Sequence, residues 1–302
     1  MSRVSYSASQ QDLYYPAKDL SSFPTARPKS DAELCAWMAL LSYCDQQPAS
    51  FAFDQNTISA KLRAMGFPSV QFFESRDHAK QGGTHCFLAI HDDPDASKNL
   101  AVVAFRGTDK DDPTDLLDDV DALLVDWNGK SKVFDGWKDA LWEVKEPLLK
   151  ALGLIDHRLL ITGHSLGSAM ATLLASLKAP NALYTIGSPR TGDQNFVDSL
   201  GGVRSYRYVD CCDVVTELPP ALLGYEHLGN PLYIDADGKV TENPSDDHVS
   251  ADRLRARADY LIQYAWKSGN VGVRDLADHA PINYVTAIAA AQPEHAVHTQ
   301  RT

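Results

Sequence analysis

The order of apolar and polar residues predicts strands alternating with helices through the middle of the chain. Apolar runs typical of buried strands lie at 84–90, 99–107, 158–162, 182–187 and 203–209. Apolar residues at helical spacing indicate helices at 136–152 and 165–177. Because parallel strands need crossover helices, this alternation predicts an α/β fold, with a mostly parallel central sheet flanked by helices on both faces.

Capping and turn residues predict the remaining elements. Ser30 and Glu33 form a capping box at the start of a helix. Further helices are predicted at 57–65, at 250–269, where the pattern is amphipathic, and at 280–291. Hairpins are predicted between the first two strands and at the Asp237-Gly238 turn.

The chain shows no internal repeat and no linker that would divide it. We therefore expect an N-terminal surface arm at residues 1–29, which are rich in Ser, Pro and Tyr. A single domain is expected at 30–291, followed by a polar tail at 292–302.

Charge and cysteine content narrow the classes of function. With 28 basic and 40 acidic residues the net charge is -12, so the overall field repels phosphate backbones and no nucleic acid partner is expected. The N-terminus lacks the apolar region of a signal peptide, and no apolar run has the length of a membrane span. As it begins, the sequence predicts a cytoplasmic protein, while export of a form with a removed leader stays open. The five cysteines lack metal-ligand spacing and are interpreted as buried thiols.

The segment 159–177 carries the clearest candidate chemistry. It reads LLIT-GHSLG-SAMATLLASL, a strand, a tight turn containing Ser165, and a helix. A Gly-x-Ser-x-Gly match is weak alone, but this context is that of a nucleophilic serine on a strained turn. The helix N-terminus directs amide hydrogens toward that position, which makes the amide of Leu166 a candidate oxyanion donor. The structural alternative is that Ser165 only caps the helix.

A nucleophilic serine needs a base, and the base needs an acid that fixes its tautomer. In hydrolases of this architecture both follow the serine in the chain, in the order acid and then base. Candidate acids follow the strand at 203–209, namely Asp210, Asp213 and Glu217. The candidate bases are His227, His248, His279, His295 and His298. Spacing alone does not choose among them.

The sequence resembles the class 3 lipase family of α/β-hydrolases, the fungal triacylglycerol lipase type, over roughly 101–285. The resemblance rests on motifs that occur in the family's order, among them AVVAFRGT, ITGHSLGSAMATLLA, YTIGSPRTGDQNFV, YRYVDCCDVVTELPP and DHAPINYV. It implies that Ser165 is the nucleophile, Asp213 the acid and His279 the base. It also implies an oxyanion hole formed by Thr108 together with Leu166.

The resemblance implies a serine ester hydrolase with the α/β-hydrolase fold. Its expected substrates are carboxylic esters, foremost acylglycerols, cleaved through an acyl-enzyme without a metal or organic cofactor. The expected partners are a lipid or small ester substrate and, transiently, a lipid interface. Phospholipase A1 activity, short-chain carboxylesterase activity and a non-catalytic binding module are the alternatives. The oligomeric state is left open.

The resemblance also assigns supporting roles. His164, inside the turn, is expected to pack beneath it, and His227 is expected to be structural. Arg106 is expected to be a buried, paired arginine, because an unpaired charge there would be costly.

The loop at 109–132 carries eight aspartates and then an apolar cluster that includes Leu123, Leu124 and Trp127. In lipases that this chain resembles, the lid follows the position of Thr108, which implies that the three apolar residues belong to a lid over the substrate. The alternative is a solvated acidic loop whose apolar residues dock on the core. No EF-hand spacing appears among the aspartates, so a calcium site is not favoured.

Overall fold

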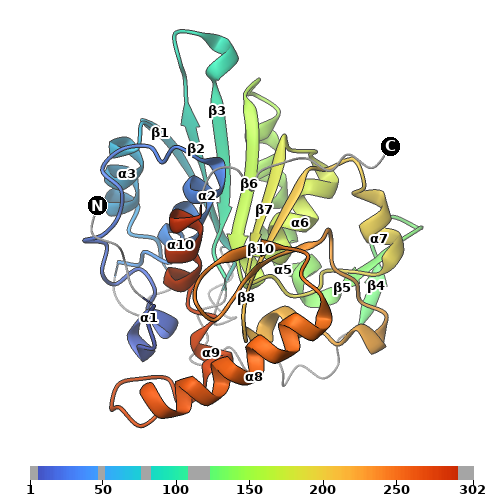
Figure 1. Ribbon diagram of the computed structural model, residues 1–302. Helices are drawn as coiled ribbons and strands as arrows, with labels where there is room; N and C mark the ends of the chain where they lie inside the picture. The colour runs from blue at the N-terminus through green and yellow to red at the C-terminus, as the bar shows by residue number, and fades with distance from the viewer. Residues whose placement is uncertain (1–5, 47–51, 76–82, 108–122, 292–302) are drawn as a thin grey trace.

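A central sheet of eight strands organises the computed structural model, which describes residues 6–46, 52–75, 83–107 and 123–291 (Figure 1). Its strand order is β1-β2-β3-β6-β7-β8-β9-β10. The strands are β1 (Ser69–Glu74), β2 (His85–His91), β3 (Leu100–Phe105), β6 (Arg158–His164), β7 (Ala182–Ile186), β8 (Ser205–Asp210), β9 (Pro231–Ile234) and β10 (Val240–Glu242). The pairs from β3 to β9 are parallel, and the outer pairs are antiparallel. The prediction of a mostly parallel sheet is confirmed.

Helices cover both faces of this sheet (Figure 1). One face carries α2 (Asp31–Leu41) and α10 (Pro281–Ala290), and the other carries α5 (Asp135–Leu152) and α6 (Leu166–Leu177). The shorter helices are α1 (Gln10–Tyr14), α3 (Gln55–Ala64), α7 (Gln194–Ser199) and α9 (Arg274–Ala277). A small hairpin is formed by β4 (Leu124–Asp126) and β5 (Lys132–Phe134).

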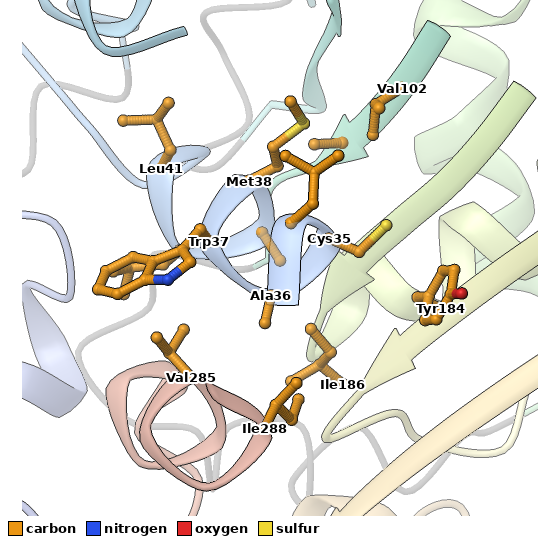
Figure 2. Packing of buried hydrophobic residues seen from close by; sticks show 14 of the residues in the cluster. Cys35, Ala36, Trp37, Met38, Leu41, Val102, Tyr184, Ile186, Val285 and Ile288 are labelled. Atoms are coloured by element: carbon orange, nitrogen blue, oxygen red, sulfur yellow. The ribbon is translucent and has the colours of Figure 1, made fainter. Parts of the chain in front are cut away.

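Helix α2 is buried on all sides because it lies between the sheet and α10 (Figure 2). Every residue from Leu34 to Leu41 is buried, and this explains why the segment is apolar around its whole circumference. The predicted cap is present, since Ser30 Oγ accepts a hydrogen bond from the Glu33 amide. Because α2 packs on β3, β6 and β7, it fixes the N-terminal part of the chain to the middle of the sheet.

The long helix α8 (Asp246–Gln263) differs from its prediction in its bounds. It begins earlier than expected because Ser245 Oγ accepts the amide hydrogen of His248 and so caps it. Its buried residues are Asp252, Ala256 and Tyr260. The exposed side chains include Leu254, Leu261 and Ile262. Burial in this helix therefore does not follow the size of the apolar side chains.

Both predicted hairpins are present, as the β2–β3 pair and the β9–β10 pair. The sequence pattern missed β1, α7 and α9, which are short. None of the helices in the described parts of the chain is long and apolar enough to cross a bilayer. All five cysteines are buried and free, as predicted.

The N-terminal segment packs against the C-terminal part of the chain, at the loop that follows α8. The Gln10 amide donates to the Gly269 carbonyl, and the Val271 amide donates to the Ala8 carbonyl. Its helix α1 belongs to a small apolar cluster with Tyr260. The division into arm, domain and tail stays a prediction, and the tail at 292–302 lies outside the described residues.

Candidate active site

The carboxyl ends of three adjacent parallel strands bring the candidate residues together. In the register of the sheet, His164 at the end of β6 pairs with Ile186 of β7, and Ile186 pairs with Tyr208 of β8. The chain leaves β6 directly into Ser165 and leaves β8 three residues before Asp213. Sequence-distant loops therefore meet at one edge of the sheet.

Ser165 occupies a strained turn between β6 and α6. Its backbone has φ 56 and ψ -132, in a region that residues with a side chain rarely adopt. The Ser165 amide donates to the Ile186 carbonyl at 3.0 Å, which fixes the turn against β7. The side chain makes no capping hydrogen bond to α6, so the capping alternative is not supported.

The two glycines of the turn are required by close backbone contacts. A Cβ atom at Gly163 would lie 2.3 Å from the Gly167 carbonyl carbon. A Cβ atom at Gly167 would lie 2.5 Å from the Phe105 carbonyl oxygen. Any larger residue would push helix α6 away from the sheet, and the serine with it.

Ser165, His279 and Asp213 form a continuous hydrogen-bonded series. His279 Nε2 lies 2.9 Å from Ser165 Oγ, and His279 Nδ1 lies 2.9 Å from Asp213 Oδ2. Ser165 is 4% exposed, His279 3% and Asp213 0%. The arrangement can move a proton from a serine hydroxyl to an imidazole that a buried carboxylate orients.

Asp213 is held by two further donors. The Tyr284 hydroxyl donates to Asp213 Oδ2 at 2.5 Å, and the Val215 amide donates to Oδ1 at 3.0 Å. Burial, and then the negative charge of Asp213, raises the pKa of Tyr284, so the hydroxyl keeps its proton and remains a donor. At Gly187, which has φ 57, a Cβ atom would lie 2.9 Å from Asp213 Oδ2. Glycine at this position leaves room for the carboxylate.

His164 packs beneath the turn, as predicted, and contacts the loop of the candidate base. Its Nε2 lies 2.8 Å from the His279 carbonyl oxygen, and its Nδ1 lies 2.8 Å from the Tyr43 hydroxyl. Because a carbonyl can only accept, Nε2 carries the hydrogen and Nδ1 accepts from Tyr43. Burial lowers the pKa of His164 well below its ordinary value, which keeps the ring neutral.

Among the described residues, the other candidate acids and bases make no hydrogen bond to Ser165. His227 Nε2 lies 2.8 Å from the Thr216 carbonyl, in agreement with a structural role. His248 is exposed on α8, while His295 and His298 lie outside the described residues. Burial, and then the charge of Asp278, raises the pKa of Asp210 well above its ordinary range. Arg106 pairs with Asp45 through both terminal nitrogens, as predicted.

Comparison with known proteins finds similarity to one family. The model of the family described as Lipase (class 3) matches residues 102–223. This part of the chain is therefore similar to the class 3 lipases.

Two curated relatives illustrate how far the similarity extends. A secreted mono- and diacylglycerol lipase 1 of Fusarium solani is 32% identical over 53% of this chain and 47% of its own length. A lipase of Rhizomucor miehei is 34% identical over 37% of this chain and 35% of its own length. The chain thus spans half or less of the length of these two lipases.

A solved structure supports the fold. The mono- and diacylglycerol lipase of Aspergillus oryzae aligns with a TM-score of 0.57 at 24% identity, over 72% of this chain and 87% of that one. The predicted α/β-hydrolase fold is confirmed.

The predicted cytoplasmic localisation is wrong. The relative from Fusarium solani is named as a secreted enzyme, and this finding contradicts the prediction. The prediction rested on the missing apolar region at the N-terminus, and such an absence does not show where a protein resides.

Of the two oxyanion donors that the resemblance implies, one lies within the described residues. Leu166 is the first residue of α6, where a backbone N–H has no partner within its own helix. Thr108 lies outside the described residues.

The three residues assigned to a lid differ in their surroundings. Leu123 is 62% exposed, and Leu124 begins β4. The Trp127 indole nitrogen donates to Ser176 Oγ on α6 at 3.1 Å, and its ring meets Phe196 edge-on. Trp127 therefore packs on the core of the protein. Most of the acidic part of the loop, 108–122, lies outside the described residues.

One group of potential metal ligands occurs among the described residues. It comprises Cys211, Cys212 and Asp278, whose ligand atoms all lie within 4.8 Å of one another. The Asp278 oxygens already accept hydrogen bonds from Arg274 and from the Cys212 amide. The hydrogen bond with Cys212, and then burial, raise the pKa of the Cys211 thiol. The group is therefore a hydrogen-bonded cluster beside the ion pair of Asp278 and Arg274.

Proposed function

We propose that the protein is a serine ester hydrolase that cleaves carboxylic esters, foremost acylglycerols. The observation that carries the proposal is the unbroken hydrogen-bonded series from Ser165 Oγ through His279 to Asp213. The match of residues 102–223 to the class 3 lipase family model supports the same reaction class. The name of the Fusarium relative supports acylglycerols as the substrate class.

In the proposed mechanism, Ser165 Oγ attacks the ester carbonyl while His279 Nε2 accepts the serine proton. Asp213 stabilises the imidazolium that results, and the proton then passes to the leaving alcohol. Water then attacks the acyl carbon and gives its proton to the same nitrogen. The bond between the acyl carbon and Ser165 Oγ breaks, His279 returns the proton to Oγ, and the acid is released. The buried carboxylate keeps Nδ1 protonated, so that Nε2 faces the serine as the acceptor.

Thr108 and the Leu166 amide are proposed as the donors that stabilise the oxyanion. Thr108→Val keeps the shape of the side chain and removes its hydroxyl. We expect kcat to fall by about 10²-fold with little change in KM, because this hydrogen bond strengthens mainly in the transition state. Steady-state kinetics on a soluble ester measure both constants. A raised KM at constant kcat would assign Thr108 to substrate binding instead.

A series of p-nitrophenyl esters of increasing acyl length tests the reaction and the substrate class. Each ester is assayed below and above its solubility limit, with Ser165→Ala as the background control. Hydrolysis that rises with chain length above the solubility limit would favour a lipase, while a preference for soluble short esters would favour a carboxylesterase. Absence of hydrolysis of every ester would refute the proposed function.

Leu123 and Leu124 are proposed to contact the acyl chain as part of a lid, whereas Trp127 is proposed to hold the loop on the core. Because Leu123 is exposed and Trp127 packs on the core, substitutions of these two residues distinguish a lid role from core packing. We expect Leu123→Ser to lower turnover of emulsified long-chain esters while leaving soluble butyrate esters and thermal stability unchanged. We expect Trp127→Ser to lower the free energy of unfolding by about 2 kcal/mol, since it removes partly buried ring contacts. Equal loss on both ester classes in Leu123→Ser would contradict the lid role.

A further inference from the structure

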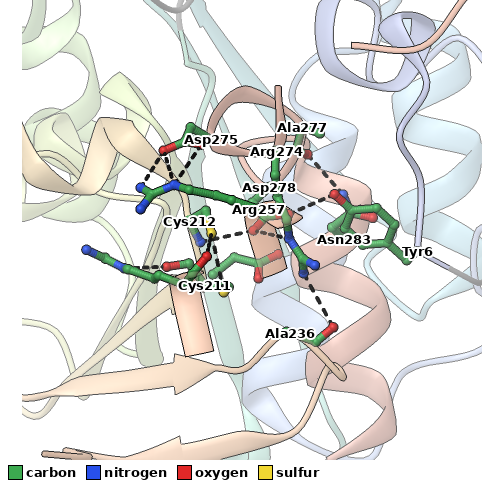
Figure 3. Close-up of polar contacts among 12 residues, drawn as sticks. Tyr6, Cys211, Cys212, Ala236, Arg257, Arg274, Asp275, Ala277, Asp278 and Asn283 are labelled. Carbon is green, nitrogen blue, oxygen red and sulfur yellow. Dashed lines mark hydrogen bonds and ion pairs between the residues drawn. The ribbon is translucent and has the colours of Figure 1, made fainter. Parts of the chain in front are cut away.

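The first described residue of the chain, Tyr6, contacts the loop that carries His279 (Figure 3). The Tyr6 hydroxyl donates a hydrogen bond to Asp278 Oδ1 at 2.8 Å, across 272 residues of sequence. Asp278 directly precedes His279 and is 0% exposed. The hydrogen bond therefore lies one residue from the proposed general base.

Asp278 joins the loop of the base to the loop of the acid. Its Oδ2 accepts from the Cys212 amide at 3.0 Å, and Cys212 directly precedes Asp213. Arg274 Nε donates to both oxygens of Asp278, at 3.1 and 3.0 Å (Figure 3). One carboxylate thus sets the relative position of the residues that precede the acid and the base.

The N-terminal segment also binds the chain beyond His279. The Ser7 amide donates to Asn283 Oδ1 at 2.7 Å, and Asn283 Nδ2 donates to the Ser7 carbonyl at 2.9 Å. The same Nδ2 donates to the Ala277 carbonyl at 3.0 Å. Asn283 is 4% exposed, and Ser7 is half-buried. Tyr6 and Ser7 therefore form hydrogen bonds with residues that precede and follow His279 in the sequence.

A buried carboxylate is sensitive to the number of its donors. Burial raises the pKa of Asp278, whereas the charge of Arg274 and the hydrogen bonds from the Cys212 amide, Arg274 and Tyr6 lower it. Burial and the charge of Asp278 raise the pKa of Tyr6, which keeps its hydroxyl protonated as a donor. Loss of the Tyr6 hydroxyl would leave Oδ1 with Arg274 Nε as its remaining donor among the described residues.

We propose that Tyr6 is a positioning residue for the proposed triad, acting through Asp278 to hold His279 between Ser165 and Asp213. The inference rests on the proposed function. In this proposal the N-terminal segment helps to position the general base, although its sequence contains no motif that predicts such a role.

The test compares Tyr6→Phe with Tyr15→Phe on a soluble ester. Tyr15 lies in the same segment and is 41% exposed, so its variant controls for the loss of a tyrosine hydroxyl. We expect Tyr6→Phe to lower kcat by about tenfold with KM within about twofold, because a small displacement of a reacting group lowers the rate steeply. The control is expected to match the wild type. Equal kcat in the two variants and the wild type would overturn the proposal.

Asp278→Asn provides a second, independent variant. If Tyr6 acts through Asp278, the double variant Tyr6→Phe with Asp278→Asn should be no slower than Asp278→Asn alone. Multiplicative losses in the double variant would show that Tyr6 acts by another route, and would overturn the proposal.

A measurement without substrate separates this proposal from the proposed function. The proton NMR resonance of His279 Nδ1–H reports its hydrogen bond to Asp213, and we expect it to shift in Tyr6→Phe but not in Tyr15→Phe. An unshifted resonance would contradict the positioning role even if the wild type hydrolyses esters. If the wild type hydrolyses no ester, the proposed function fails while the resonance still tests the geometry.

Discussion

Replacing Ser165 with alanine is expected to lower kcat for ester hydrolysis by about 10³-fold or more. The reason is that the remaining groups, His279 and the oxyanion donors, have no nucleophile to activate or stabilise. The fold should persist, because the Ser165 side chain makes no capping hydrogen bond to α6. Initial rates on a soluble p-nitrophenyl ester, together with thermal unfolding, measure the two effects separately.

A nearby serine gives this experiment a matched control. Ser168 lies one turn along α6, and its hydroxyl donates to the Gly163 carbonyl at 2.5 Å. Ser168→Ala should cost stability, because this buried hydrogen bond is lost, but should retain turnover by the folded enzyme. Activity of Ser165→Ala within about tenfold of the wild type would exclude Ser165 as the nucleophile.

Asp213→Asn and His279→Ala are expected to lower kcat by about 10³-fold or more each, and together by little more than the poorer single variant. This result follows if both residues act on Ser165 as one acid–base unit, since removal of either member disables the other. The double-mutant cycle on kcat measures the coupling.

His227→Ala is the control for loss of a buried histidine. Its ring contacts the Thr216 carbonyl rather than Ser165, so the variant should lose stability and keep kcat in the folded fraction. Full activity in His279→Ala, or additive losses in the double variant, would place the general base elsewhere.

The sequence predicted the turn at Ser165 because its determinants are local. Gly163 and Gly167 flank the serine, and the strand and helix adjoin them directly, so one short segment contains both the motif and its geometric context. The parallel sheet could also be predicted from the sequence. Its strands are continuous apolar runs, and the segments between them carry apolar residues at helical spacing.

The acid and the base could not be chosen from spacing, because they come from loops that only the tertiary fold brings together. His279 and Ser165 are separated by 114 residues. The supporting residues were harder still: Tyr284 gave no signal beyond its place in the DHAPINY motif, and Tyr6 lies in a segment without periodicity. In α8, Asp252 and Ala256 are buried while Leu254 is exposed, so the buried face could not be derived from hydrophobicity alone.

Formation of one covalent adduct tests Ser165 as the nucleophile most directly. The protein is incubated with diethyl p-nitrophenyl phosphate, which phosphorylates activated serines and releases one p-nitrophenol, and the product is examined by intact mass and peptide mapping. We predict a single adduct on Ser165 of the wild type, none on Ser165→Ala and strongly slowed labelling of His279→Ala. Labelling at another residue, or no adduct on a folded wild-type protein, would contradict the assignment of Ser165 as an activated nucleophile.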